Sequence, residues 1–424
     1  MKEINNSHSK NTNGATVDKG KARKANNKYY KKTSKIENFL TSVLSEKKLN
    51  LMKLVNNSLK NLSGIDQEWN SYQYHRQKFN VSEIDYIPPV FVATIVDSCN
   101  LRCPNCFYIL ENPDKWFNST LSVKKFEQIL KKYNKEMKAK IIFLTGGEPL
   151  IHPQFGELVK ICRDYKLIPK IASNGILIMN NPSALENLEY ANISADSYDY
   201  ETYNKYRGGT KRQFDRMVEG LNFLKESNLN FSISFVLSRE NIFDFEKMIE
   251  FAERFKPGLA YFHNINPFGS DKFKPLSGQD EYSMKYIAKA MQRTDYEIDI
   301  FTPPIFNEKS SIFTETKCVY PWLYFCFNSK GDVSYCNLME HDSKIGNVFN
   351  NYDFNSPKML DWRKNIIVGK IEDGCLYCQR RFTDKQKFAF FDSEKRKWLL
   401  SNEGNDIVRG LQKIFSDNQP HLHI

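Results

Sequence analysis

The sequence predicts an α/β protein whose core is a parallel sheet or an open barrel. Six strand-like runs alternate with amphipathic, helix-like stretches between residues 91 and 265. Parallel strands need a crossover connection, usually a helix, so this alternation is typical of repeated βα units. Polar and glycine-containing turns follow the first four runs. The carboxyl ends of parallel strands are where such folds build functional sites, so the turns fit the same fold class.

The strand-like runs are short apolar stretches bounded by turn residues. They are FVATIVD (91–97), KIIFLT (140–145), PKIAS (169–173), YANISA (190–195), FSISFVLS (231–238) and LAYFHNI (259–265). The helix-like stretches place apolar residues at helical spacing. They include LSVKKFEQILKKY (121–133), FGELVKICRDY (155–165), FDRMVEGLNFLKE (214–226) and FDFEKMIEFAERF (243–255).

The N-terminal part of the chain carries most of its positive charge. The formal net charge is +11, and residues 1–35 contribute nine Lys and one Arg against Glu3 and Asp18, which is +10 − 2 = +8. This segment has almost no large aliphatic residues, so we expect a disordered basic tail that solubilises the chain. The remaining +3 does not require a nucleic-acid partner. Residues 36–89 are expected to form a helical extension.

The chain contains no stretch of about 18 uninterrupted apolar residues and no apolar signal region, so we expect neither a membrane span nor secretion. Nine cysteines in such a chain are read as thiols, metal ligands or core residues rather than as disulfides. We therefore expect a cytoplasmic protein, and the spacing of the cysteines becomes the main question.

Three cysteines follow the first strand with the spacing CX3CX2C: Cys99, Cys103 and Cys106. Three ionisable thiols so close together indicate a shared role. Neither His nor Cys occurs in the next 40 residues to complete a tetrahedral zinc site. A cubane iron–sulfur cluster fits, because three irons would take the thiolates and the fourth would stay open. A zinc site that borrows a distant ligand is the alternative.

Leu144-Thr145-Gly146-Gly147-Glu148-Pro149 directly follows the second strand. The two glycines allow the backbone to approach a bound molecule, and Glu148 could accept hydrogen bonds from an ammonium group. Ser173-Asn174-Gly175 ends the third strand and Ser194-Ala195-Asp196 the fourth. If the strands are parallel, all of these turns lie at one edge of the sheet, together with the cysteine triplet.

A second group of cysteines lies near the C-terminus. Cys318 and Cys336 bracket a hairpin signal, with Gly331 between them (CX12GX4C), and Cys375 and Cys378 follow as CX2C. Four thiolates from a hairpin and a CX2C turn could hold either zinc or a fully ligated [4Fe-4S] cluster. The aromatics of the hairpin, such as Trp322 and Phe325, are expected to form the core of this small domain.

CX3CX2C after the first strand and GGEP after the second resemble the radical S-adenosylmethionine (SAM) enzymes, over residues 90–270. The resemblance implies a partial (β/α)6 barrel of the TIM type over 90–310, with a [4Fe-4S] cluster on Cys99, Cys103 and Cys106. It also implies that SAM binds the open iron, near Gly146, Gly147 and Glu148.

The same resemblance implies that Ser194 contacts the ribose and that Arg207 reaches the SAM carboxylate. The family has an aromatic residue directly before the third cysteine, but this chain has Asn105. Phe107 or Tyr108 could take over the contact with the adenine, so the residue that packs on the adenine stays open.

The C-terminal cysteines resemble the Twitch domain, the shortened relative of the SPASM domain. This favours one auxiliary [4Fe-4S] cluster on Cys318, Cys336, Cys375 and Cys378, in a small α+β domain over residues 311–390. Residues 391–424 are expected to form a helix and a tail. Cys162 and Cys326 are read as packed core thiols, although Cys326 could replace an auxiliary ligand. His152 is interpreted as a loop-positioning residue. For His263, Asn264 and Asn266 an ordinary structural role is favoured, and contact with the substrate is the alternative.

The resemblance implies reductive cleavage of SAM to a 5′-deoxyadenosyl radical that abstracts hydrogen from a substrate. A peptide maturase (crosslinking, epimerisation or oxidation) is favoured slightly over a dehydrogenase of a small molecule such as an amino sugar. The implied partners are the substrate and a cytoplasmic electron donor of the flavodoxin or ferredoxin type. A non-enzymatic zinc-ribbon protein that binds nucleic acid would explain the tail and the CX2C motif, but it leaves GGEP and the open triplet unexplained.

Overall fold

The computed structural model describes residues 82–400 with gaps at 107–118, 181, 267–271, 277–280, 303–304, 307–316, 319, 340–343, 371–374, 376–380, 383–385, 388 and 395. The basic tail, most of the 36–89 extension and the expected C-terminal helix lie outside the described residues. No described helix has the length and apolar character needed to cross a membrane.

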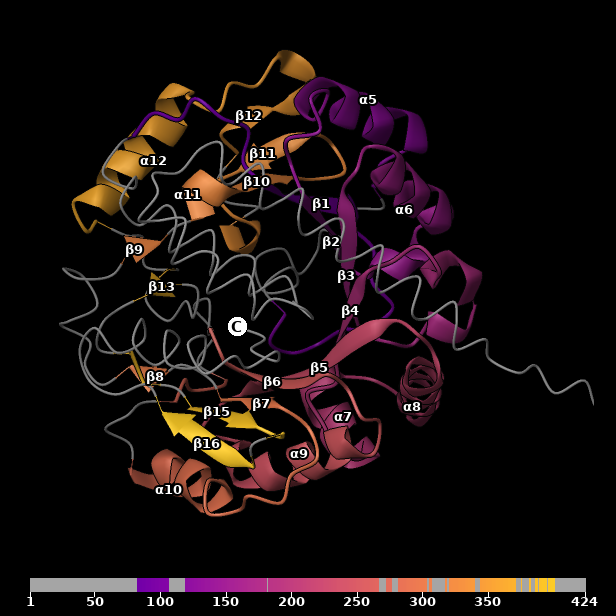
Figure 1. The fold of residues 1–424 in the computed structure, drawn as a ribbon, viewed down its shortest axis with the longest axis vertical. Helices are drawn as coiled ribbons and strands as arrows, with labels where there is room; N and C mark the ends of the chain where they lie inside the picture. Colours follow the sequence, from indigo (N-terminus) through magenta and orange to yellow (C-terminus); the bar gives the residue numbers. More distant parts are fainter. Residues whose placement is uncertain are drawn as a thin grey trace, which may run out of the picture.

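A curved, mostly parallel sheet forms the centre of the molecule (Figure 1). Its parallel strands follow each other in chain order from β1 to β7. They are β1 (Val90–Val96), β2 (Ile141–Gly146), β3 (Ile168–Ser173), β4 (Tyr190–Ser194), β5 (Asn230–Leu237), β6 (Leu259–Asn264) and β7 (Ile300–Phe301). The first six are the six runs expected from the sequence, so the partial α/β barrel is confirmed.

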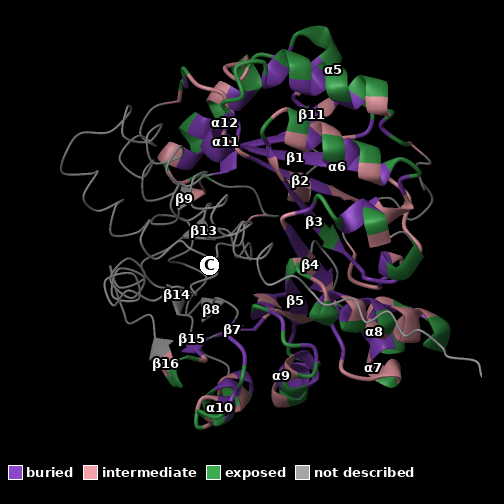
Figure 2. Ribbon diagram, turned by 45° about the vertical axis from the view of Figure 1, so that its right-hand side comes forward, coloured by how far each residue is buried: buried purple, intermediate pink, exposed green. Residues whose placement is uncertain are grey.

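The main helices cover the outer face of the sheet, with their buried residues turned toward the strands (Figure 2). They are α5 (Val123–Tyr133), α6 (Phe155–Asp164), α7 (Tyr200–Arg207), α8 (Lys211–Glu226), α9 (Phe245–Glu253) and α10 (Glu281–Ala290). Helices α5, α6, α8 and α9 correspond to the expected amphipathic stretches, whereas α7 and α10 were not expected. Short 3-10 helices, such as η1 (Pro149–Ile151) and η4 (Ile242–Asp244), complete several connections.

The C-terminal hairpin extends the same sheet at its β1 edge. Strand β10 (Tyr324–Phe327) runs parallel to β1, and β11 (Asp332–Ser334) and β12 (Gly346–Asn347) continue it antiparallel. The predicted hairpin is therefore present. The Phe91 and Phe325 rings lie 5.2 Å apart edge to face, so the hairpin aromatics pack into the core of the barrel and not only into a small-domain core.

Two further strands extend the opposite edge of the sheet. Strand β15 (Ala389–Asp392) pairs antiparallel with β7, and β16 (Lys397–Leu400) pairs with β15. We did not expect strands here. Helix α11 (Tyr320–Leu323) precedes β10, and α12 (Pro357–Ile367) follows the hairpin. Short two-stranded pairs join β8 (Ile305–Phe306) to β14 (Gln386–Lys387) and β9 (Lys317–Cys318) to β13 (Arg381–Phe382).

Candidate active site at the carboxyl ends of the strands

The cysteine loop leaves the carboxyl end of β1. Cys103 is buried, and Cys99 and Cys106 are half-buried. Backbone contacts give the loop its shape: the Cys106 N–H donates to the Cys103 carbonyl (3.1 Å), and the Leu101 N–H points to Cys99 Sγ (3.4 Å). The three thiols predicted as one donor set therefore lie on one short, ordered turn.

Burial raises the pKa of Cys99 to about 11 and that of Cys103 to about 12. The free thiols are therefore protonated at neutral pH, and metal binding has to displace protons. No three described Cys, His, Asp or Glu side chains converge to hold a single metal ion. Three cysteines match the donor set of a cubane cluster in which each thiolate binds a different iron and the fourth iron stays open.

The Gly146-Gly147-Glu148 turn, at the end of β2, lies directly behind the cysteine loop. The Gly147 N–H donates to Val96 O and the Glu148 N–H to Ser98 O, both at 2.9 Å. A Cβ on Gly147 would lie 2.3 Å from Ser98 O, and one on Gly146 (φ +151°) would lie 2.0 Å from Val96 O. Only glycine allows this contact, so the two motifs form one backbone unit.

The Glu148 carboxylate is buried and accepts three hydrogen bonds from the chain. The Leu150 N–H (3.1 Å) and the Ser173 hydroxyl (2.8 Å) donate to Oε1, and the Asn174 N–H donates to Oε2 (2.7 Å). Burial raises the Glu148 pKa, and these donors oppose that shift. In this structure the carboxylate joins the ends of β2 and β3.

Asn174 connects the end of β3 to the cysteine loop. Its amide donates to Asn100 Oδ1 (2.6 Å), and its nitrogen lies 3.9 Å from Cys99 Sγ. From the other side, Gln213 of α8 donates to Asn100 O (2.8 Å). Sequence reasoning placed Asn174 at a strand end but did not identify Asn100 or Gln213. Their contacts span 74 and 113 residues, and a local motif gives no signal for them.

Arg207, at the end of α7, is half-buried beside the cysteine loop, with 12% of its side chain exposed. Its Nη1 donates to Asp196 Oδ2 (2.8 Å), and Asp196 Oδ1 accepts from the Val236 N–H (2.7 Å). Burial lowers the Arg207 pKa, but Cys103 and Asp196 outweigh that effect and raise it overall. The buried Arg207 Nε has no hydrogen-bond partner within the described part of the chain. A buried guanidinium donor without an acceptor fits an anionic group such as a carboxylate.

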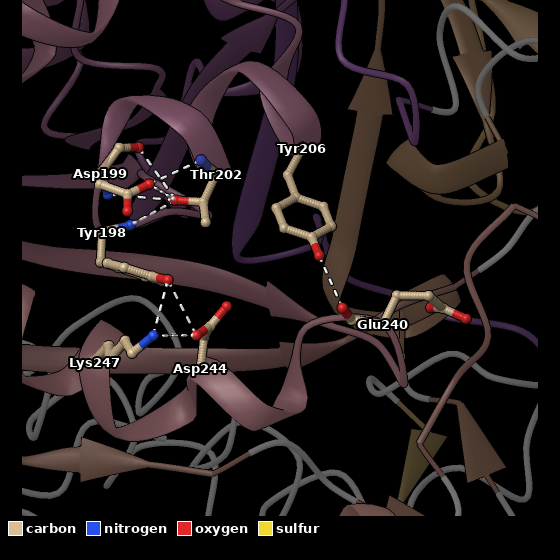
Figure 3. A network of polar contacts seen from close by, with 7 residues as sticks. All are labelled: Tyr198, Asp199, Thr202, Tyr206, Glu240, Asp244 and Lys247. Atoms are coloured by element: carbon tan, nitrogen blue, oxygen red, sulfur yellow. Dashed lines mark hydrogen bonds and ion pairs between the residues drawn. The ribbon is translucent and has the colours of Figure 1, made fainter.

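Polar contacts hold α7 in place (Figure 3). The Tyr206 hydroxyl donates to Glu240 O (2.9 Å). The Tyr198 hydroxyl donates to Asp244 Oδ1 (3.1 Å), and Lys247 contacts both groups. Helix α7, and with it Arg207, is therefore tied to the loop that follows β5.

Ser194 lies on the inner face of the sheet. Its neighbour Ile193 faces outward, where its side chain lies beside Gly175 and α8. Ser194 pairs in register with Ser234 of β5, and one layer below, the Ser232 hydroxyl donates to Asn192 Oδ1 (2.8 Å). The inner wall at β4 and β5 therefore carries polar side chains, of which Ser232 and Ser234 are buried.

Two of the four predicted auxiliary cysteines, Cys318 and Cys336, flank the hairpin. Cys318 ends β9, Cys336 follows β11, and both are half-buried, as is Cys375. Cys378 lies outside the described residues, so the complete four-thiol set stays a prediction. Cys326, on β10, is 3% exposed, and Cys162, on α6, is fully buried. Both are packed as expected.

His152 Nδ1 accepts a hydrogen bond from the Gln154 N–H (3.1 Å), and His152 Nε2 contacts Leu121 O (2.9 Å). These contacts support the prediction that His152 positions the loop. The Asn264 amide bonds both backbone groups of Leu276, so its role in this structure is structural. His263 is half-buried beside the Tyr261 ring (4.1 Å) and stays a substrate-contact candidate, as does Asn266.

Residues 94–252 match the radical SAM superfamily. The chain is 27% identical to the Fe-coproporphyrin III synthase of Methanosarcina barkeri over 181 residues, 42% of this chain and 44% of that protein. It is 24% identical to the subtilosin biosynthesis protein AlbA of Bacillus subtilis over 282 residues, 61% of this chain and 58% of that protein. The chain thus spans about half the length of these relatives.

Among solved structures, the fold is similar to that of SuiB from Streptococcus suis bound to its precursor peptide SuiA. The TM-score is 0.53 at 18% identity, over 74% of each chain. At this identity the likeness concerns the fold alone.

Proposed function

From the membership of this chain in the radical SAM superfamily over residues 94–252, we propose that the protein cleaves SAM reductively and modifies a peptide. When bound, the [4Fe-4S] cluster and SAM supply an electron and a 5′-deoxyadenosyl radical that abstracts a substrate hydrogen. The observation that carries the proposal is the backbone contact of Gly147 and Glu148 with Val96 and Ser98, which holds the glycine turn against the cysteine loop.

Each side chain then has a distinct task. Cys99, Cys103 and Cys106 would hold the cluster, and the close approach of Gly146 and Gly147 would leave backbone groups for the SAM ammonium. Glu148 fixes this turn through Ser173 and Asn174.

Arg207 Nε would donate to the SAM carboxylate, and Asp196 holds the guanidinium in the orientation this requires. Ser194, on the inner wall, would reach the ribose. We further propose that Cys318, Cys336, Cys375 and Cys378 hold one auxiliary [4Fe-4S] cluster, and that the protein works in the cytoplasm with a protein electron donor.

A peptide substrate is supported by AlbA, which takes part in bacteriocin biosynthesis. A small-molecule substrate is the second candidate. The matched Fe-coproporphyrin III synthase favours it, because that enzyme makes a tetrapyrrole. An amino sugar would be another substrate of this class.

The test is anaerobic reconstitution of the full chain. We expect about eight irons per chain, as two cubane clusters require, and 5′-deoxyadenosine after reduction with dithionite. The Cys99→Ala, Cys103→Ala and Cys106→Ala variants should each lose 5′-deoxyadenosine formation. Cys162→Ala, a change at a buried thiol away from both sites, should keep the full iron content and serves as the matched control.

Replacing Cys375 and Cys378 together with Ala should remove about half the iron and preserve cleavage of SAM without substrate. Uptake of zinc alone, with no SAM cleavage under reductant, would refute the proposed function.

A further inference from the structure

One buried hydroxyl on α7 is left without a hydrogen bond. Tyr203 is fully buried, and its hydroxyl has no hydrogen-bond partner among the residues that the structure describes. On the same helix, the Tyr206 hydroxyl does have a partner, because it donates to Glu240 O (2.9 Å, Figure 3). A hydroxyl that is buried without a partner loses its hydrogen bonds to water and gains none in exchange. A ligand that binds next to Tyr203 would remove this cost.

Tyr203 lies on the face of α7 that also carries Arg207. The two residues are four positions apart, so their side chains are neighbours on the helix surface. The Arg207 Nε atom is buried and likewise lacks a partner within the described ranges. Two donors without acceptors on one helix face fit a negatively charged group that lies next to both.

The turn that ends α7 packs on both the cysteine loop and the Tyr203 ring. Gly208, the C-cap of α7, has a φ of +65°, and a Cβ on it would lie 2.6 Å from Arg102 O. A Cβ on Gly209 would lie 2.1 Å from Tyr203 Cε1 and 3.0 Å from Cζ, the ring atom that bears the hydroxyl. The hydroxyl edge of the ring and the cysteine loop are therefore held by two adjacent glycines.

The charged groups that act on the Tyr203 hydroxyl belong to the cysteine loop and to the ion pair at the end of α7. Burial has the largest effect on the Tyr203 pKa and raises it, and the Arg207 guanidinium opposes this shift. Cys103, Asp196 and Cys99 raise the pKa further, and Cys103 has the largest effect of these three. The hydroxyl therefore keeps its proton at neutral pH and remains a hydrogen-bond donor.

We propose that Tyr203 donates a hydrogen bond to the Cys103 sulfur once the cluster is bound, and that this hydrogen bond raises the reduction potential of the cluster. This inference rests on the proposed function. In the free protein Cys103 is a thiol, which is a weak acceptor, whereas a cluster ligand is a thiolate and accepts more strongly. Reduction adds one negative charge to the cluster, and a donor to its sulfur stabilises that charge. Tyr203 would thus make it easier for the cluster to accept an electron.

The test compares Tyr203→Phe with the matched control Tyr206→Phe in the reconstituted holoenzyme. A reductive titration without SAM, followed by electron paramagnetic resonance, measures the reduction potential. The signal that changes when SAM is added to a parallel sample identifies the SAM-binding cluster. We expect Tyr203→Phe to lower the potential of this cluster by about 59 mV, which is a tenfold change in the reduction equilibrium. Tyr206→Phe should keep this equilibrium within about twofold of the wild type.

Urea unfolding of the full-length apoprotein separates the proposed role from a structural one. The Tyr203 hydroxyl has no partner before the cluster binds, so Tyr203→Phe should unfold at the same urea concentration as the wild type or at a higher one. Tyr206→Phe breaks the hydrogen bond to Glu240 O and should unfold at a lower urea concentration. If Tyr203→Phe destabilised the apoprotein and left the potential unchanged, Tyr203 would have a structural role and the proposal would be wrong.

Two other results would overturn the proposal. One is an equal reduction potential in Tyr203→Phe and Tyr206→Phe. The other is a shift in Tyr203→Phe that appears only after SAM is added, because the acceptor would then lie on SAM and not on Cys103. Absence of any SAM-responsive cluster in the wild type would instead overturn the proposed function, so the two failures are distinguishable.

Discussion

At the residue scale, the contact between Gly147 and Ser98 gives the sharpest prediction. The Cβ of Gly147→Ala would lie 2.3 Å from Ser98 O and 2.7 Å from Asp97 O. Both atoms belong to the backbone, so the cysteine loop has to shift. We expect this variant to retain less than about half of the wild-type iron, because cluster ligation depends on the precise placement of the thiols.

Gly156→Ala, on α6, is the matched control. Its Cβ would lie 3.3 Å from the Ala184 side chain, a contact that a small movement relieves. We expect this variant to take up iron as the wild type does, with a change in unfolding free energy within about 1 kcal/mol. Iron determination after anaerobic reconstitution measures both variants. Full iron uptake by Gly147→Ala would show that the loop does not depend on this contact.

Site residues could be predicted where they form a motif of neighbouring residues in the sequence. They could not be predicted where the fold brings together residues that are distant in the sequence. The cysteine spacing and the glycine turn are local signals, and the sequence marked both. The structure gives the Glu148 carboxylate partners from β3, and it pairs Arg207 with Asp196. Neither contact follows from spacing along the chain, because each depends on how neighbouring strands and helices pack.

At the scale of elements, the long amphipathic helices were predictable and the short ones were not. Helix α8 has 16 residues, and the expected stretch 214–226 covers most of its apolar face but not the capping box of Thr210 and Gln213 at its start. Helix α7 has eight residues and buries mainly Tyr203 and Tyr206. An apolar face of two tyrosines is too short to show helical periodicity, so its recognition required the tertiary contacts of Figure 3.

His152 makes the connection between β2 and α6 sensitive to pH. Its ring accepts from the Gln154 N–H, which requires the neutral form, and burial lowers its pKa below the ordinary 6.5. As the pH falls, His152 is therefore protonated in the unfolded chain at a higher pH than in the folded protein. The stability that neutral His152 contributes is present above about pH 6.5 and is lost below it, at no more than about 1.4 kcal/mol per pH unit.

The His152→Asn variant tests this dependence. The variant keeps an acceptor for Gln154 but cannot titrate, so we expect it to be less stable than the wild type at pH 7.5 and to approach the wild type near pH 5.5. Urea unfolding at several pH values measures both proteins. Parallel stability curves for the wild type and the variant would show that His152 does not cause this pH dependence.

At the scale of the whole molecule, strands remote in sequence complete the sheet at both edges. The alternation of residues 91–265 predicted β1 to β6 in order, because each βα unit is local. Strand β10 pairs with β1 from the other end of the barrel sequence (Tyr324 with Val90), and β15 pairs with β7 across a separation of 390 − 301 = 89 residues. Strands of four residues at such separation carry no signal of their partner in the sequence. The sequence therefore predicted the hairpin but not its place in the sheet.

The shared core of barrel and hairpin predicts that the two unfold together. The Phe325 ring is 2% exposed and lies 5.2 Å from Phe91 on β1 and 5.1 Å from Tyr133 on α5. Phe325→Ala removes contacts with both elements and should cost about 3–5 kcal/mol of unfolding free energy, as large-to-small core changes do. Exposed Phe349→Ala, in the same hairpin region, should cost less than about 1 kcal/mol. Tryptophan fluorescence and far-UV circular dichroism should still follow one coincident urea transition in each protein. A separate early transition in Phe325→Ala would show instead that the hairpin unfolds as an independent unit on a barrel that is stable without it.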